Sequence, residues 1–412
     1  MDAQLQQPTD GIAPFTRLIL DLRGVCFIIE RETLMSLPES VLLCLFPNGL
    51  VLSDNGMDEM GGDSAQDEHV YHVDFDAQCL QYVLSFFRRA QDYFYGTEVT
   101  QGVYRGGDTG NSYLDYVEQM NNSLMGYGAP FHLPFFHKQA VIVLREELEY
   151  FTIAPKSMGR SAAQPTVGNE PPSASPQFNH LKDLCGEVLL RRRQIFTALQ
   201  RNISKENNVA EQHLIDMLCM SGFETDDLWG YRAREPARCG ITSTALVLLK
   251  TGVTHPGELP EGRDGNQPVP NKPIGVEREG VSMEKGIDMS NTVFSEEQLG
   301  EWVDDGQGGM LRVNQHQLNT TQKLLLFWRK PARKCWWDGV TIIVPMDPSM
   351  QKAIGISRSN MTTSSLNGTT PEERKWLEQG MGVPVRVWVR RVWTLEVSLS
   401  EPEVDMLCTS TG

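Results

Sequence analysis

Two short apolar runs, residues 18–22 and 25–29, begin the pattern of hydrophobic and polar positions along the chain. Both runs are rich in leucine, isoleucine and other side chains that strands favour. Arg23 and Gly24 stand between them, which is the length of the shortest hairpin loop. The pattern therefore predicts a β-hairpin that turns at these two residues.

A helix is predicted after the hairpin, because start and stop signals bracket the apolar run 41–46. Ser36 offers a hydroxyl cap, Pro38 suits a first turn and Glu39 suits the positive end of the helix dipole. The segment 47–49, Pro-Asn-Gly, ends the helix. Apolar residues go almost all the way round it, so we expect it to be buried.

Further along, His72-Val73-Asp74-Phe75-Asp76 reads as a short strand running into the cap of the next helix. Apolar residues recur after it at helical spacing. They are Leu80, Val83, Leu84, Phe86 and Phe87, with Arg88 following.

These segments carry a resemblance to a known family. The segments 20–27, 31–40 and 72–88 resemble the opening strands and helices of a BTB/POZ domain of the potassium-channel-tetramerisation type. More narrowly, they resemble fungal growth-regulation and general-stress-response proteins that contain this domain. The segment 144–151 resembles the closing helix of the domain. Residues 15–155 would then form it, with two insertions at about 53–68 and 96–134 that depart from the family pattern.

The middle of the chain is predicted to be a linker followed by a helical subdomain. Residues 156–176 are rich in proline, serine and glycine and cannot bury enough surface to offset the entropy of ordering. Residues 177–250 form the helical subdomain, in which Asn208 caps a second helix that ends at Gly222. The apolar run 241–249 within it fits a helix or a strand. Helical spacing links Leu181, Leu184, Val188, Ile195, Leu199 and Ile203.

After a second disordered linker at 251–290, the region 291–400 is predicted to be rich in strands. Apolar runs at 324–328 and 340–344 read as strands, and 371–380 reads as a short capped helix. Residues 383–399 then alternate apolar and polar, as a strand with one buried face does. Arg391 interrupts the apolar series, which indicates a bulge or a turn. The fold class is therefore α+β.

Composition excludes some classes of function. The 412 residues hold 53 acids against 37 bases, a net charge of −16, which argues against nucleic-acid binding. The N-terminus lacks a signal peptide, no apolar run approaches the ~20 residues that span a bilayer, and the scattered cysteines suit a reducing compartment. We expect a cytoplasmic protein whose contact with the plasma membrane is peripheral and made through a partner.

Candidate chemistry is sparse, and no catalytic, cofactor-binding or metal-binding residue is predicted. Asp21 follows a strand as a phosphatase nucleophile does, but Arg23 stands where the general acid is required. Asp74 and Asp76 have the required spacing, yet helix capping explains them better. His69 and His72, like His132 and His137, lack further ligands at metal-binding spacing.

Two groups of residues remain as predicted protein-binding positions. One is the pair Trp336 and Trp337, beside Lys330, Arg333 and Lys334, a composition typical of interface hot spots and also of membrane-surface patches. The plainer alternative is that one tryptophan belongs to the core and the cations are solvated. The other group is Asp21, Arg23, Asp74, Phe75 and Asp76.

The resemblance implies a function that the composition alone does not give. It implies a non-enzymatic adaptor in stress response and nutrient-dependent growth restraint, which scaffolds and activates plasma-membrane phosphatases of the aspartate class upstream of target-of-rapamycin signalling. It also implies self-association through the BTB domain. Two alternatives stay open: a substrate receptor for a cullin ubiquitin ligase, and a phosphatase that uses Asp74 and Asp76.

Overall fold

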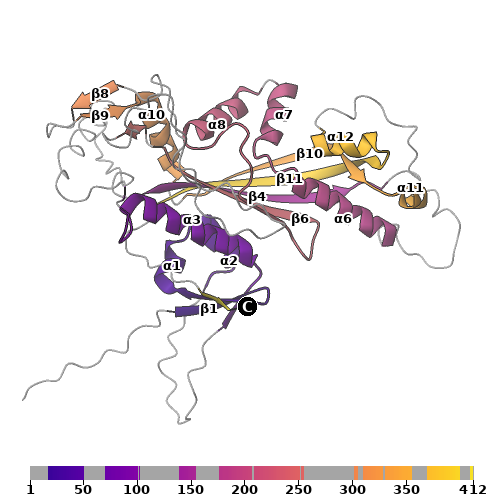
Figure 1. Ribbon diagram of the computed structural model, residues 1–412, viewed down its shortest axis with the longest axis horizontal. Coiled ribbons are helices and arrows are strands. Elements are labelled where there is room, and N and C mark those ends of the chain that lie inside the picture. The colour runs from indigo at the N-terminus through magenta and orange to yellow at the C-terminus, as the bar shows by residue number, and fades with distance from the viewer. Residues whose placement is uncertain are drawn as a thin grey trace, which may run out of the picture. The chain divides into compact units, whose positions relative to one another are not determined.

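The computed structural model divides the chain into two compact units, each described here by itself (Figure 1). The first unit comprises residues 1–140 together with 398–412, and the second comprises 141–397. The structure describes residues 17–50, 70–100, 102, 139–154, 176–206, 208–250, 252–254, 301–304, 310–327, 330–354, 369–399 and 409–411. The acidic segment 53–68 lies outside these ranges, as do almost all of the two predicted linkers and of the insertion at 96–134.

The first unit begins with the predicted β-hairpin. Strands β1 (Arg17–Leu22) and β2 (Val25–Glu30) pair antiparallel, with Leu22 opposite Val25. The two loop residues both have positive φ, 53° at Arg23 and 92° at Gly24. This geometry matches the right-handed twist of the flanking strands, so the chain reverses in two residues. The hairpin prediction is confirmed.

Helices α1 (Arg31–Ser36) and α2 (Glu39–Leu45) follow, and they correct two predictions. Ser36 does not cap α2; its hydroxyl donates to the Thr33 carbonyl of α1, while Pro38 occupies the N-cap position without a side-chain hydrogen bond. Full burial of α2 is also wrong, because Leu43 is 53% exposed. Only one side of this short helix faces the core.

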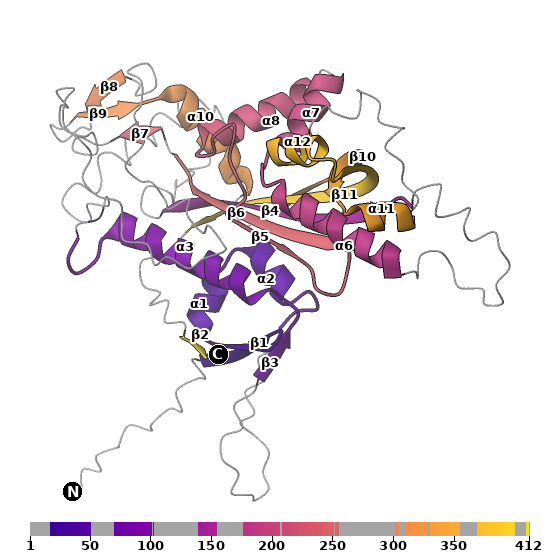
Figure 2. The same ribbon diagram turned by 45° about the vertical axis from the view of Figure 1, so that its right-hand side comes forward.

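The rest of the first unit completes a small mixed sheet with three helices on one side (Figures 1 and 2). Strand β3 (Val70–Val73) runs parallel to β1, and β12 (Thr409–Thr411) runs antiparallel to β2. Helix α3 (Ala77–Tyr95) begins directly after β3, as its apolar spacing predicts. The buried residues of α3 are Cys79, Leu80, Val83, Leu84, Phe86, Phe87 and Ala90.

A five-stranded antiparallel sheet forms the centre of the second unit (Figure 2). Its strands, in sheet order, are β10 (Ala332–Pro345), β11 (Gly382–Leu399), β4 (Ala140–Thr152), β6 (Gly240–Leu248) and β5 (Tyr231–Arg234). The long β10 and β11 pair without interruption from Ala332 opposite Leu395 to Pro345 opposite Gly382. Strands far apart in the sequence thus build one surface.

This sheet corrects the predicted helix at 144–151. That segment lies in β4 and pairs with β6, with Leu148 opposite Ile241. The run 141–144 is buried on both sides of the sheet, which hides the alternation by which an exposed strand is recognised. The open alternative at 241–249 is settled as strand for 240–248. The predicted domain boundaries themselves stay predictions.

Helices α6 (Pro176–Arg191), α7 (Thr197–Glu206) and α8 (Val209–Met220) lie between β4 and β5 in the sequence. The residues from Leu181 to Ile203, which recur at helical spacing in the sequence, therefore belong to two separate helices. The break between α6 and α7 contains a β-bridge from Gln194 to Leu228. Asn208 caps α8 as predicted, because its side chain accepts from the Ala210 amide.

The main core of the second unit lies between α6 and the sheet (Figure 2). Every second residue of the central strands faces α6 there, as the pleat of a strand requires. From the strands come Leu148, Tyr150, Ile241, Val340, Ile342, Val344, Val383, Val385, Val387 and Val389. From α6 come Phe178, Leu181, Cys185, Val188 and Leu189.

The remaining elements of the second unit bear out one prediction and correct another. Helix α12 (Pro371–Glu378) has the predicted cap: the Glu373 amide donates to Thr370, and the Thr370 amide donates back to the Glu373 carboxylate. The predicted strand at 324–328 is wrong, because 315–327 form α10 (Gln315–Leu324) and a 3₁₀ turn. Helix α11 is Pro348–Ile354, and a separate sheet joins β7 (Val253–Thr254), β9 (Met310–Val313) and β8 (Glu301–Asp304).

Candidate functional site

Several predicted binding residues meet at the hairpin end of the small sheet. The Arg23 Nε lies 2.6 Å from an Asp74 carboxylate oxygen. Asp21 accepts from the Gly24 amide at 2.7 Å, and its other oxygen lies 2.9 Å from the His72 Nδ1. The parallel pairing of β1 with β3 places Asp21 directly beside His72, so residues 51 positions apart converge here. We call these five residues the turn cluster.

The turn cluster is partly open to solvent: the Arg23 and Asp21 side chains are each 23% exposed, and those of Asp74 and His72 are more open. The Asp74 side chain is 90% exposed and the His72 side chain is 80% exposed. The Gly24 amide, and after it the His72 ring, hold the pKa of Asp21 below its ordinary value. Asp21 therefore carries a negative charge at neutral pH, and the cluster presents charges of both signs in a fixed arrangement.

Arg23 adopts an unusual backbone conformation within the turn cluster. Its φ of 53° is in the left-handed region, a conformation that costs a residue with a Cβ atom about 1–2 kcal/mol. Asparagine, aspartate or glycine normally fills this position of a two-residue hairpin. Arginine occupies the position in this chain despite that cost, and strained residues of this kind gather at functional sites.

The structure gives Phe75 and Asp76 other roles. Phe75 is buried, so its ring belongs to the core and does not contact solvent. Asp76 is the N-cap of α3 and accepts from the Cys79 amide at 2.9 Å. Helix capping, which the sequence favoured over catalysis for these acids, accounts for Asp76, while Asp74 is the ion-pair partner of Arg23.

The predicted tryptophan pair separates onto the two faces of β10, because neighbouring strand residues point in opposite directions. Trp336 donates to the Glu211 carboxylate at 3.0 Å and packs edge to face against Trp393. Trp337 is 61% exposed. Its ring stacks with that of Phe151 at 6.3 Å between centroids. Trp336 is thus partly buried and Trp337 exposed, and the role of either ring in binding stays a prediction.

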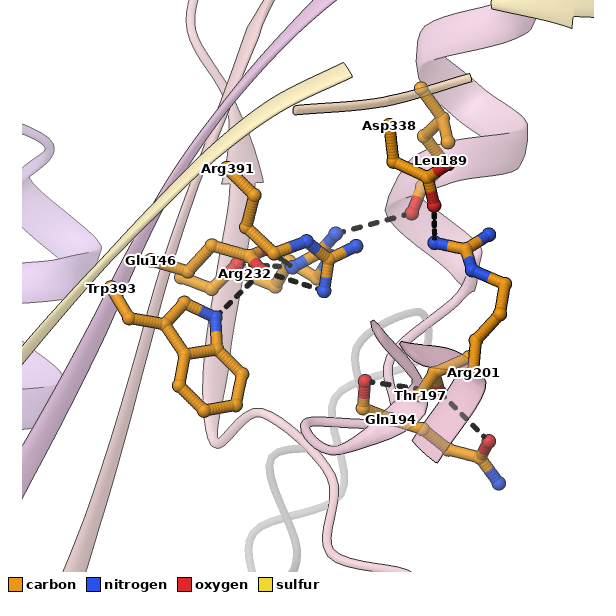
Figure 3. A network of polar contacts seen from close by, with 10 residues as sticks. Glu146, Leu189, Gln194, Thr197, Arg201, Arg232, Asp338, Arg391 and Trp393 are labelled. Atoms are coloured by element: carbon orange, nitrogen blue, oxygen red, sulfur yellow. Dashed lines mark hydrogen bonds and ion pairs between the residues drawn. The ribbon is translucent and has the colours of Figure 1, made fainter. Parts of the chain in front are cut away.

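A polar network inside the second unit was not predicted (Figure 3). Glu146 of β4 is fully buried and lies 2.6 Å from Arg232 of β5 and 2.9 Å from Arg391 of β11. Trp393 donates to the same carboxylate at 3.2 Å, and Arg232 donates to the Leu189 carbonyl at 3.3 Å. Three strands therefore meet at one buried acid, and Arg232 links it to α6.

The network explains the interruption at Arg391 in the apolar series of β11. The pairing of β10 with β11 continues through this residue, so the expected bulge or turn is absent. Arg391 points inward with the valines and finds a carboxylate there. Its charge among apolar neighbours was the one signal of the network in the sequence. Arg390, its neighbour, points to the other face and pairs with Glu149 at 3.2 Å.

Burial by itself would raise the pKa of Glu146, but the guanidinium groups of Arg391 and Arg232 outweigh it and hold the pKa below its ordinary value. Nearby, Arg201 of α7 pairs with Asp338 of β10 (Figure 3). These contacts tie helices to strands. Both oxygens of Glu146 have partners, so the network reads as structural and not as a reaction centre.

The described residues form neither a metal-binding group nor a helix that could span a membrane. No group of three histidine, cysteine, aspartate or glutamate side chains is arranged to hold a metal ion within the described part of the chain. None of the helices described above is both long enough and apolar enough to cross a membrane.

Comparisons with known proteins place the chain near fungal growth regulators. It is 26% identical over 451 aligned residues to a growth regulation protein of Saccharomyces cerevisiae, covering 92% of this chain and 90% of that protein. It is 27% identical over 378 residues to a WHI2-like protein of Schizosaccharomyces pombe, covering 92% and 85%. No protein-family model and no solved structure matches. The chain is thus a distant homologue of these proteins over almost its whole length.

Proposed function

We propose that this protein is a non-enzymatic adaptor in growth regulation. The distant similarity to a growth regulation protein extends over 92% of the chain, so it includes both compact units. The described residues offer exposed charged and aromatic surfaces, and both oxygens of the buried Glu146 are held by side chains of neighbouring strands. Two units with separate surfaces suit a protein that brings two partners together.

The observation that carries the proposed binding site is the strained Arg23. Its backbone energy favours asparagine or glycine, and its ion pair with the exposed Asp74 contributes little to stability. A contact with a partner would account for an arginine in this conformation. The turn cluster is therefore the proposed docking site of the first unit.

The proposed partner is a plasma-membrane-associated phosphatase of the aspartate class, which the adaptor binds and activates in nutrient stress. This proposal rests on the resemblance of 20–27, 31–40 and 72–88 to BTB/POZ stress-response proteins. The same resemblance proposes a BTB/POZ fold for the first unit and self-association through it. Met35 and Leu43, exposed on α1 and α2, are apolar positions that such pairing would cover.

The test is affinity purification of the full-length protein from its source cell during starvation, followed by mass spectrometry. Three forms are compared: the wild type, Arg23→Asn in the turn cluster, and Arg191→Ala as a charge-matched control on α6. We expect a membrane phosphatase to copurify with the wild type and the control but not with Arg23→Asn. The Arg23→Asn variant should still fold, because asparagine suits the positive φ of this turn.

Other outcomes overturn the proposal in distinguishable ways. Recovery of a cullin in place of the phosphatase favours the ubiquitin-ligase receptor. Retention of the phosphatase by Arg23→Asn removes the turn cluster as the docking site. Phosphatase activity of the pure protein that Asp74→Asn abolishes would establish an enzyme instead of an adaptor.

A further inference from the structure

One face of the five-stranded sheet carries a group of exposed aromatic rings. In residues 335–341 of β10, 384–390 of β11 and the end of β4, side chains that face α6 alternate with more exposed side chains on the opposite face. The open positions include Phe151, Trp337 and Trp388, which are 51%, 61% and 46% exposed. Large aromatic side chains are seldom left this open without a partner.

The three rings form one continuous surface. Phe151 of β4 and Trp337 of β10 stack across the intervening β11, with ring planes inclined by 18°. The Ile153 amide donates to the Arg386 carbonyl, and Arg390 pairs with Glu149, so Phe151 lies opposite Trp388 across β4 and β11. We call Phe151, Trp337, Trp388 and Arg386 the aromatic face.

Arg386 gives the aromatic face an unsatisfied positive charge. It is exposed and, among the residues that the structure describes, no carboxylate pairs with it. Its guanidinium lies across Gly339, where a Cβ would come within 2.5 Å of Nη2. The neighbouring Arg390 differs, because it pairs with Glu149 at 3.2 Å. Among the described residues, Arg386 is thus an exposed guanidinium without a carboxylate partner, two positions from Trp388 on β11.

We infer that the aromatic face binds an extended peptide segment of a protein partner in which acidic residues alternate with apolar ones. Tryptophan and arginine dominate the energetics of protein interfaces, and a planar guanidinium can donate two parallel hydrogen bonds to one carboxylate. In an extended segment, alternate side chains point the same way, so apolar residues can cover the rings while a carboxylate reaches Arg386. This inference stands on a different surface from the turn cluster and does not depend on the proposed phosphatase.

The chain supplies its own reporter for the experiment. Cys335 is exposed on β10, two residues before Trp337 and therefore on the same face, whereas Cys79 and Cys185 are buried. Burial raises the pKa of Cys185 to about 12, so this thiol stays protonated and unreactive. Alkylation of Cys335, followed by mass spectrometry, reports whether a ligand covers the aromatic face.

The probe is a fluorescent synthetic peptide in which leucine alternates with glutamate, used with the full-length protein. Its counterparts carry glutamine or lysine in place of glutamate. We expect the glutamate peptide to bind and to slow alkylation of Cys335, and the glutamine and lysine peptides to bind more weakly. Arg386→Ala should weaken binding of the glutamate peptide about tenfold, as expected for one charge-assisted hydrogen bond, and Trp388→Ala at least as much.

Two variants separate a binding effect from a folding effect. Gly339→Ala keeps every charge but displaces the flexible end of Arg386, so it should weaken the peptide without lowering the melting temperature. Arg191→Ala removes another exposed arginine, which lies on α6 and pairs with Glu372, and should leave binding unchanged. Equal affinity for Arg386→Ala and the wild type overturns the inference. So does tighter binding of the lysine peptide, or binding to vesicles of anionic lipid but to none of the peptides.

Discussion

The turn cluster and the Glu146 network use the same chemistry, a carboxylate facing guanidinium groups, at opposite extremes of burial. In the turn cluster the Asp74 side chain is 90% exposed, whereas Glu146 and Arg232 are buried. The Arg23–Asp74 distance is 2.6 Å, the same as the Glu146–Arg232 distance. Geometry alone therefore cannot tell the two apart, and solvent decides what each contact contributes.

Water explains the difference. An exposed ion pair replaces good hydration with a comparable contact and typically contributes ~0–1 kcal/mol. A buried pair has already lost its hydration, so removing one partner leaves an unpaired charge in the interior and costs ~3–5 kcal/mol. We therefore expect the network to control the stability of the second unit and the turn cluster to control recognition.

The largest expected effect follows from removing the buried charge. Glu146→Gln keeps the size of the side chain but leaves Arg232 and Arg391 without a carboxylate, and should lower the free energy of unfolding by ~3–5 kcal/mol. Tryptophan fluorescence during urea unfolding measures this, because all eight tryptophans lie within 141–397 and so report on the second unit. A loss below ~1 kcal/mol would show that water or neighbouring groups compensate Arg232.

Acid should weaken the same network. The pKa of Glu146 is lower in the folded protein than its ordinary value of 4.5, so its contribution to stability is fully present above that pH. The contribution is lost as the pH falls from 4.5 through the lowered pKa. Unfolding curves of wild type and Glu146→Gln should therefore converge at low pH. A stability difference between the two proteins that stays constant across this pH range would show that Glu146 is not charged in the folded protein.

A smaller effect is expected at the capping box of α12. Thr370→Ala removes the side-chain acceptor for the Glu373 amide and should cost ~1 kcal/mol in the same fluorescence measurement. Thr370→Ser keeps the hydroxyl and serves as the control, with less than half of that loss expected. Equal losses for the two variants would assign the effect to the methyl group and not to the cap.

The smallest effect on stability is expected in the turn cluster, where the substitution removes strain as well as an ion pair. Arg23→Asn loses the exposed ion pair with Asp74 but relieves the left-handed strain at φ 53°, so stability should stay within ~1 kcal/mol of the wild type or rise. Hydrogen exchange of the β1 and β2 amides measures this. A marked loss of protection would show that Arg23 serves the fold, and would remove the argument that it is kept for a partner.

Local patterns that need only neighbouring residues predicted their elements well. The β1–β2 hairpin follows from two β-rich runs around Arg23-Gly24, and the α12 cap follows from Thr370, Pro371 and Glu373. The helix expected at 144–151 came from the family resemblance and not from periodicity, and it is wrong because the segment lies in strand β4. The run 141–144 is covered on both faces, so there is little alternation in the sequence to indicate a strand there.

The candidate sites divide in the same way. The sequence identified Asp21, Arg23 and Asp74 singly, but only the parallel pairing of β1 with β3 brought them together with His72. It also singled out Trp337, whereas Phe151, Arg386 and Trp388 became its neighbours through the order of β10, β11 and β4. Alternation along a strand is written in the sequence, but the identity of the neighbouring strand is not.

What the sequence by itself determined is therefore local: the hairpin turn, the caps of α3, α8 and α12, and the acidic overall charge of −16. Tertiary structure decided which charges are buried. Arg390 and Arg391 are adjacent in the chain, yet one pairs with a partly exposed Glu149 and the other with the buried Glu146. The pleat of β11 places them on opposite faces of the sheet. The packing on each face then decides how far each ion pair is buried, and therefore how much it contributes to stability.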